Sequence, residues 1–352
     1  MNSKKWIKIL LILCILAVGF VGGINYLVDP LWTFSHSNRF NNAQNGFDER
    51  QQKTNYIFNR GLNNYEGILL GSSRTTFMNQ NDFVNMNIYN YASSSMYPYE
   101  YKGYIDFTKK IKGKDFKYII IGSDFYGTKI PKDVKFENPE FYIENTTSFL
   151  YKYKMLFSIN LLKKSISNIR ISLKNSGFYY DRNNVKYQLK VSESERLQRY
   201  TENLERHTLE LSNPKYKYNN DYINILKKIK NENPNTKFII FTSAVTSDLL
   251  VSIIKNGNRI YEYERWLKEL IEVFGEVNHF MTINTITKNL ENYPDDDHAY
   301  PHILKLLANR LSNAGNNDVP QDFGVLVTKE NINEYLENLR KQIEEYDLSK
   351  LK

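Results

Sequence analysis

The chain has 352 residues, of which 41% are hydrophobic and 14% aromatic. This composition provides for a sizeable core and excludes a disordered chain. The formal net charge of +8 favours a polyanionic neighbour, such as an anionic membrane face, a nucleic acid or an acidic cell-envelope polymer. The single cysteine, Cys14, excludes an intrachain disulfide.

The N-terminus carries the pattern of a membrane span. Lys4, Lys5 and Lys8 precede residues 9–24, which contain no charged side chain. An apolar run of about 20 residues is long enough to cross a bilayer as a helix. The basic flank predicts a cytoplasmic N-terminus and a single-pass topology that exports the rest of the chain. The alternative is a cleaved signal peptide, but no small-x-small cleavage site follows the run. We therefore expect residues 1–30 to be an uncleaved anchor.

Five short apolar runs have the length and composition of buried strands. They lie at residues 68–70, 87–91, 118–121, 238–241 and 277–283. Before them, residues 31–63 are polar, rich in asparagine and prone to turns, which predicts a juxtamembrane segment. Three of the runs end in small or polar residues. In parallel sheets the working residues lie at the carboxyl ends of the strands.

Helical patterns lie between the apolar runs. Tyr263, Leu267, Leu270 and Phe274 repeat at helical spacing, and Gly275 follows at the position of a C-terminal cap. Strands that alternate with helices indicate a parallel sheet between helical layers. The sequence therefore predicts a three-layer α/β/α sandwich of flavodoxin-like character over residues 64–313.

Residues 140–230 interrupt this alternation. They are rich in tyrosine and lysine, with helices expected near 148–175 and 193–211, and we interpret them as a helical insertion that forms a lid or cap over the sheet. Residues 151–190 contain nine lysines or arginines and one acid, Asp181. Two interpretations stay open for them: a solvated basic face, or a surface for a polyanion or membrane. An extracytoplasmic location argues against nucleic acid as the partner.

The tail, residues 314–352, contains an amphipathic helix from Thr328 onward. Its apolar positions are Ile332, Tyr335, Leu336, Leu339 and Ile343, which are expected to pack or pair rather than to catalyse. No glycine-rich phosphate loop and no histidine or cysteine cluster with metal-ligand spacing is found, so the sequence predicts no cofactor and no metal.

Two short motifs carry the chemistry. The first is Gly71-Ser72-Ser73-Arg74, which displays a serine just after a buried strand. The second is Asp295-Asp296-Asp297-His298, which opens a helix. An Asp three residues before a His can bind Nδ1 and leave Nε2 for a serine hydroxyl, which is what nucleophilic acyl transfer requires. Taken alone, the first motif is an ordinary turn and the second an acidic helix cap.

Together the two motifs resemble those of the SGNH/GDSL hydrolases. Gly71-Ser72-Ser73-Arg74 is similar to the family's Gly-Asp-Ser block, with Ser73 as nucleophile, and Asp295-x-x-His298 is similar to its Asp-x-x-His block. The order of the motifs is also that of the family. The arrangement resembles membrane-anchored relatives such as the D-alanine transfer protein and the accessory acetyltransferases of exopolysaccharide export. This resemblance implies a cell-surface polymer, an acyl donor and a multi-span membrane acyltransferase as partners.

The family's oxyanion residues are matched less well. Gly122-Ser123-Asp124 stands where the family has Gly-x-Asn, and an ionised Asp124 would repel an oxyanion. The family's second-block glycine aligns with Ser93-Ser94-Ser95. The resemblance thus implies Ser93, Ser95, Asp124 and Arg74 as oxyanion or substrate-binding residues. The alternative role for Asp124 is to fix a loop or pair with a basic side chain.

We therefore expect an extracytoplasmic esterase or O-acyltransferase that uses Ser73, Asp295 and His298 as a triad. Ser72 is the nearest rival to Ser73, and His302 is the rival to His298. The competing hypothesis is a catalytically inactive scaffold of an envelope assembly complex, which Asp124 would favour.

Overall fold

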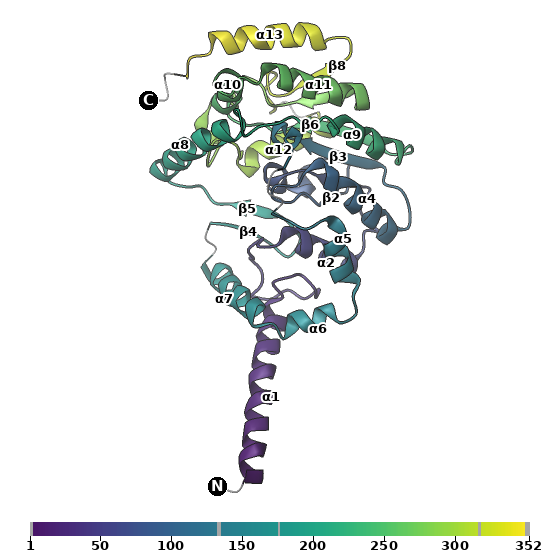
Figure 1. Ribbon diagram of the computed structural model, residues 1–352, viewed down its shortest axis with the longest axis vertical. Helices are drawn as coiled ribbons and strands as arrows, with labels where there is room; N and C mark the ends of the chain where they lie inside the picture. The colour runs from purple at the N-terminus through teal and green to yellow at the C-terminus, as the bar shows by residue number, and fades with distance from the viewer. Residues whose placement is uncertain (1–2, 132–134, 175–176, 316–317, 349–352) are drawn as a thin grey trace. The chain divides into compact units, whose positions relative to one another are not determined.

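The computed structural model describes residues 3–131, 135–174, 177–315 and 318–348. The chain forms two compact units (Figure 1). The N-terminal unit comprises Met1–Leu62 and Glu137–Leu189, and the sheet unit comprises Asn63–Phe136 and Lys190–Lys352. The expected single insertion at 140–230 is therefore divided: its first part belongs to the N-terminal unit and its second part to the sheet unit.

The sheet unit is an α/β fold with a mostly parallel six-stranded sheet, as the alternation of strands and helices predicts. Its strands are β1 (Gly67–Leu70), β2 (Ile88–Asn90), β3 (Tyr118–Ser123), β6 (Lys237–Thr242), β7 (Glu276–His279) and β8 (Val325–Thr328). Its α-helices are α3 (Ser73–Thr76), α4 (Pro98–Lys112), α8 (Glu193–Glu210), α9 (Tyr222–Asn231), α10 (Ser247–Lys255), α11 (Ile260–Phe274), α12 (Pro301–Leu311) and α13 (Ile332–Glu345). Short 3₁₀ turns occur at η1 (Gln80–Asp82), η2 (Phe125–Thr128) and η3 (Leu290–Asn292).

The strand order is β2-β1-β3-β6-β7-β8. The first five strands are parallel, and numbered along the chain their order is 2-1-3-4-5, the order of flavodoxin-like sheets. In this order the chain reverses direction between β1 and β3, so their carboxyl ends flank a crevice in which ligands bind. The motif that begins at Gly71 follows β1, and Asp124 follows β3. The fold therefore brings both to the crevice.

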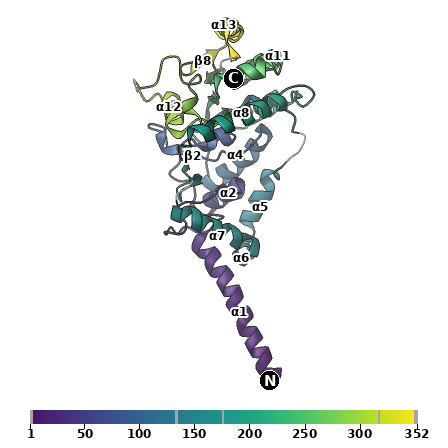
Figure 2. The ribbon, with the colours of Figure 1, turned by 90° about the vertical axis from the view of Figure 1, so that its left-hand side faces the viewer.

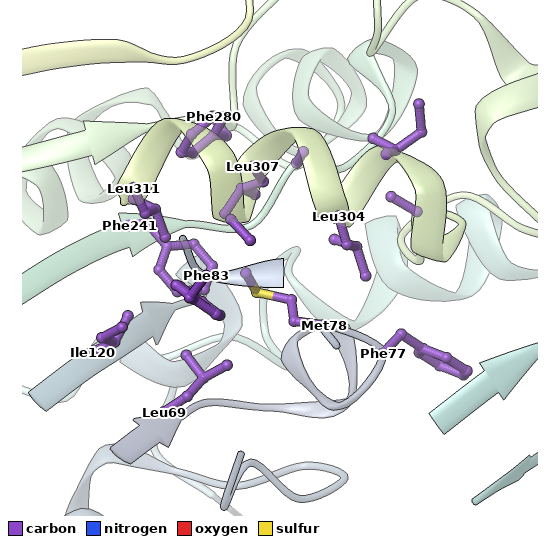
Figure 3. Packing of buried hydrophobic residues seen from close by; sticks show 14 of the residues in the cluster. Leu69, Phe77, Met78, Phe83, Ile120, Phe241, Phe280, Leu304, Leu307 and Leu311 are labelled. Carbon is purple, nitrogen blue, oxygen red and sulfur yellow. The ribbon is translucent and has the colours of Figure 1, made fainter. Parts of the chain in front are cut away.

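Helices cover both faces of the sheet. On one face Leu69 and Ile120 pack with Leu304, Leu307 and other apolar residues of α12 (Figure 3). Side chains alternate along a strand, so Ser123 points to the opposite face from Ile120. There the Ser123 hydroxyl bonds the side chains of Tyr222 in α9 and Trp266 in α11, with oxygen–oxygen and oxygen–nitrogen distances of 3.0 and 3.1 Å. The sheet thus has a core on each side.

Strand β8 was not expected from the sequence. It is only four residues long and pairs antiparallel with β7 at the edge of the sheet. Because its partner lies far back in the chain, no local pattern distinguishes it from a loop. The amphipathic helix after it is confirmed as α13, with four of its five expected apolar positions buried and Tyr335 half-buried. Helix α11 ends as expected at Gly275, whose φ is +93°.

The N-terminal unit contains α1 (Ser3–Val28), α2 (Glu49–Arg60), α5 (Pro139–Thr147), α6 (Tyr151–Leu156), α7 (Ile159–Lys174) and the hairpin β4 (Phe178–Tyr180) with β5 (Lys186–Gln188). Helix α1 is long and apolar enough to cross a membrane. Helices α6 and α7 pack at its C-terminal end (Figure 2).

The expected turn-prone segment at 31–63 is wrong in one respect, because it contains the well-packed helix α2. Every residue from Glu49 to Ile57 is buried. Their polar groups are bonded within the unit: Glu49 accepts hydrogen bonds from the Tyr180 hydroxyl at 2.6 Å and from Lys186 Nζ at 2.9 Å. A helix of polar residues resembles an exposed one in sequence, and only such partners allow its burial.

Candidate active site

Ser73 lies at the start of a short helix that leaves the carboxyl end of β1. Ser72 is the N-cap of α3, and its hydroxyl accepts from the Arg74 amide. Two glycines make room for this turn: Gly71, which directly follows β1, and Gly122, the next-to-last residue of β3. A Cβ at Gly71 or at Gly122 would lie 2.3 Å from the Thr75 hydroxyl oxygen. The small residues of the motif therefore allow α3 to pack closely on the sheet.

Ser73, His298 and Asp295 form one hydrogen-bonded series. Ser73 Oγ is 2.9 Å from His298 Nε2, and His298 Nδ1 is 3.0 Å from Asp295 Oδ2. Asp295 Oδ1 also accepts from the backbone amides of Asp297 and His298, at 3.1 and 2.8 Å. These amides fix the carboxylate, so Asp295 can hold the Nδ1 proton and leave Nε2 to accept from the serine.

A second carboxylate faces the same histidine. Asp297 Oδ1 lies 2.8 Å from His298 Nδ1 as an ion pair without hydrogen-bond geometry. Burial by itself would lower the pKa of His298, but Asp297 and Asp295 outweigh it and raise that pKa well above 6.5. Burial would raise the pKa of Asp297, yet His298 and Arg74 hold it well below its usual value. Asp297 therefore stays ionised beside the imidazole.

Arg74 ties the parts of this site together. Its side chain is 13% exposed, and its guanidinium lies between two carboxylates. Nη2 is 3.0 Å from Asp297 Oδ2, and Nη1 is 3.2 Å from Asp124 Oδ1. The other oxygen of Asp124 accepts a short hydrogen bond from the Ser72 hydroxyl. Asp124 thus has the pairing role that the sequence left open, with arginine as its basic partner. Both its oxygens are committed to Arg74 and Ser72.

The residues expected to bind an oxyanion are not all brought together. The Ser93 amide donates to the Gly71 carbonyl at 3.1 Å, and Ser93 is fully buried. It therefore holds the segment after β2 against the residue that follows β1, and it does not line the cavity. Ser95, with a positive φ of 53°, lines the cavity beside Ser73. The Ser73 amide is at the first position of α3, where an N–H has no acceptor within the helix. Ser73 and Ser95, but not Ser93, therefore line the cavity.

The cavity above Ser73 measures about 230 Å³. Its lining includes Tyr126, Lys135 and three residues of α8: Arg206, His207 and Glu210. Sequence reasoning missed His207 because it precedes the Asp-rich motif by many residues. Its Nδ1 is 2.7 Å from Asp296 Oδ2. Burial raises the pKa of Asp296, because its effect is larger than that of this hydrogen bond, which lowers the pKa. The only advance signal was the scarcity of histidine, five in the whole chain.

Among the residues that the structure describes, two sets of side chains have ligand atoms within 4.8 Å of one another. They are His207 with Asp296 and Asp297, and His298 with Asp295 and Asp297. Asp297 belongs to both sets. Its Oδ2 is already 3.0 Å from the permanently charged Arg74, which would repel a metal cation. The arrangement is better suited to proton transfer than to cation binding.

His302, the rival base, lies at the second position of α12 and is exposed, with its ring stacked on Tyr300 at 6.0 Å between centroids. The structure therefore places His298, and not His302, against Ser73.

Comparison of the chain with protein-family models finds no match, and comparisons with curated proteins and with solved structures find none either.

We expect Asp124→Asn to destabilise the sheet unit. The substitution leaves Arg74 with one carboxylate partner instead of two, and loss of a partner from a buried ion pair costs about 3 kcal/mol. Denaturant unfolding followed by fluorescence of the buried Trp266 measures the change. Asp115→Asn is the control, because it removes the pair of an exposed carboxylate with the half-buried Lys109 and should change the free energy of unfolding by less than about 0.5 kcal/mol. Equal effects of the two substitutions would contradict the role assigned to Asp124.

The pH dependence of serine reactivity should report the second carboxylate. His298 accepts a proton from Ser73 only when neutral, so reactivity is lost as the pH falls through the raised pKa of His298. Asp297→Asn removes one of the charges that raise this pKa, and the acid limb should move to lower pH. The rate of labelling by a fluorophosphonate, measured from pH 5 to 10, gives the profile. Asp106→Asn, at an exposed pair with Lys102, should leave it unchanged. An unmoved limb in Asp297→Asn would mean that Asp295 alone sets the pKa.

Proposed function

We propose that this protein is a membrane-anchored, extracytoplasmic SGNH-like esterase or O-acyltransferase that modifies a cell-surface polysaccharide or a teichoic-acid-like polymer. The observation that carries the proposal is the contact of Ser73 with His298 and of His298 with Asp295 in an open cavity. An inactive scaffold would have no need to keep three such side chains aligned.

The chemistry follows from these contacts. His298 Nε2 removes the Ser73 proton while Ser73 Oγ attacks the carbonyl carbon of an ester or thioester. The tetrahedral intermediate collapses, the leaving alcohol or thiol takes the proton from His298, and an acyl-serine remains. A polymer hydroxyl, or water, then attacks the acyl-serine with His298 again as base. This returns the Ser73 hydroxyl and completes the transfer or the hydrolysis.

The carboxylates support both halves of this reaction. The imidazolium that forms in each step lies beside Asp295 and the ionised Asp297, which favour its positive charge. Donors for the oxyanion would come from the Ser73 amide and from the segment at Ser95. No neutral amide side chain stands at the end of β3, which favours a slow transferase over a rapid hydrolase.

The proposed location rests on α1 and its flanks. The helix is apolar along its length, and its N-terminal end carries Lys4, Lys5 and Lys8. Basic residues are retained on the cytoplasmic side of a membrane. The sheet unit would then face outward, toward the polymer and toward the multi-span acyltransferase that would supply the acyl group.

Fluorophosphonate labelling tests the nucleophile directly. Ser73→Ala should abolish labelling while the protein stays folded, and His298→Ala should slow it by about 100-fold or more. His302→Ala is the matched control and should change the rate little. Ser72→Ala should keep the label but lose about 1 kcal/mol of stability with its helix cap. Labelling that persists in Ser73→Ala and disappears in Ser72→Ala would identify the other serine, and no labelling of the parent protein would favour the scaffold.

Protease treatment of intact spheroplasts tests the topology. Because the basic flank precedes α1, we expect added protease to degrade the sheet unit without detergent. A cytoplasmic protein of the same cells serves as the control for intact membranes. Full protection of the sheet unit, with digestion only after lysis, would refute the outward location and the polymer as substrate.

A further inference from the structure

Helix α7 buries polar side chains and exposes apolar ones, the reverse of what is usual for a surface helix. Its buried positions include the polar residues Ser165, Asn168 and Ser172. Its outward positions include Ile159, Ile166 and Leu173, which recur every seven residues and are 67%, 41% and 64% exposed. A helix on the surface of a soluble protein buries its apolar stripe and exposes its polar one. The exposed stripe of α7 therefore indicates a nonpolar neighbour.

The buried polar face of α7 is used to attach it to the end of α1. Asn25, near the C-terminus of α1, accepts a hydrogen bond from the Ser165 hydroxyl at 2.8 Å. The amide of the same Asn25 side chain donates to the carbonyls of Leu156 and Ser158, at 2.8 and 3.0 Å. These contacts hold α6 and α7 at one level along α1 (Figures 1 and 2).

That level coincides with the edge of the bilayer that α1 would cross. Of the residues of α1, the buried ones are Gly22, Asn25 and Val28, all in its last two turns. The preceding part, from Trp6 to Val21, is about 24 Å long as a helix, a few ångströms less than a hydrocarbon core of about 30 Å. Contacts at Gly22 and Asn25 therefore place α6 and α7 where the acyl region meets the headgroup layer.

The composition of this region matches a membrane interface. Phe149, Leu150, Tyr153 and Phe157 are exposed on and beside α6, the helix that precedes α7 in the chain. Residues 148–180 contain six basic side chains and no acidic one: Lys152, Lys154, Lys163, Lys164, Arg170 and Lys174. Aromatic and apolar groups surrounded by lysine and arginine are typical of helices that lie in the headgroup region of anionic lipid.

We propose that Phe149–Leu150, α6 and α7 together form an interfacial collar. This collar lies in the anionic headgroup layer of the membrane crossed by α1. The inference rests on the proposed membrane anchoring and adds a second contact with the same bilayer. The apolar stripe enters the upper acyl region, and the lysines reach the phosphates. Such a collar holds the N-terminal unit on the membrane surface instead of leaving it on a free helix.

Site-specific quenching by lipid tests the collar on the full chain. In a Cys14→Ser background, single cysteines are introduced as Phe149→Cys, Ile166→Cys and Leu173→Cys and labelled with an environment-sensitive fluorophore. The proteins are reconstituted at one copy per nanodisc of phosphatidylcholine and phosphatidylglycerol, with or without lipid that carries a nitroxide near the headgroup. Tyr261→Cys is the matched control, because Tyr261 in the sheet unit is 76% exposed, as is Phe149.

The collar predicts that nitroxide lipid lowers fluorescence about twofold or more at all three positions and leaves Tyr261→Cys unchanged. Replacing phosphatidylglycerol by phosphatidylcholine should weaken the quenching, and an unchanged signal would overturn the role of anionic lipid. The parent protein is labelled at Cys14, its single cysteine, which lies near the middle of the apolar run, and is measured with lipid that carries the nitroxide deep in the acyl chain. This measurement separates the two hypotheses. Quenching at Cys14 without quenching at the three positions would overturn the collar but keep the anchor, as expected if another protein covers the stripe. No quenching at Cys14 would overturn both.

Discussion

The position of Arg74 between Asp124 and Asp297 is the interaction on which the candidate site depends. A guanidinium keeps its charge at any physiological pH, so its burial requires carboxylates close by. One of these carboxylates follows β3 and the other precedes α12. The ion pairs therefore join three segments that are far apart in sequence, at the crevice where the direction of the strand order reverses. The helix that carries Ser73 and the loop that carries His298 are held in register by the same side chain.

The two carboxylates beside His298 have different physical roles. Asp295 is fixed by backbone amides and bonds Nδ1, so it determines the ring orientation and the tautomer. Asp297 is fixed by Arg74 and contributes mainly its charge. Their combined field favours the imidazolium, which helps in the transition state but keeps the resting histidine protonated to a higher pH. A site of this kind is suited to an alkaline or slow reaction.

The N-terminal unit shows how buried polar groups can organise a segment with few apolar ones. Helix α2 is buried although it is rich in charged and amide side chains, because its partners include Tyr180, Lys186 and Thr146. Asn25 plays the same part between α1 and α7. Hydrogen bonds of this sort are directional, so they specify one packing arrangement where apolar contacts would allow several.

The sequence by itself determined the features that depend on neighbouring residues. The apolar N-terminal helix, the parallel strands, the serine after β1 and the Asp-x-x-His before α12 were all evident from local periodicity and spacing. What it did not determine depends on partners distant in the chain. This group comprises the pairing of β8 with β7, the burial of α2, the division of residues 140–230 between two units, and the contacts of Asp124 and His207. A carboxylate after a strand looks the same in sequence whether it faces an oxyanion or an arginine. Only the tertiary structure, by bringing Arg74 against Asp124, decided between the two.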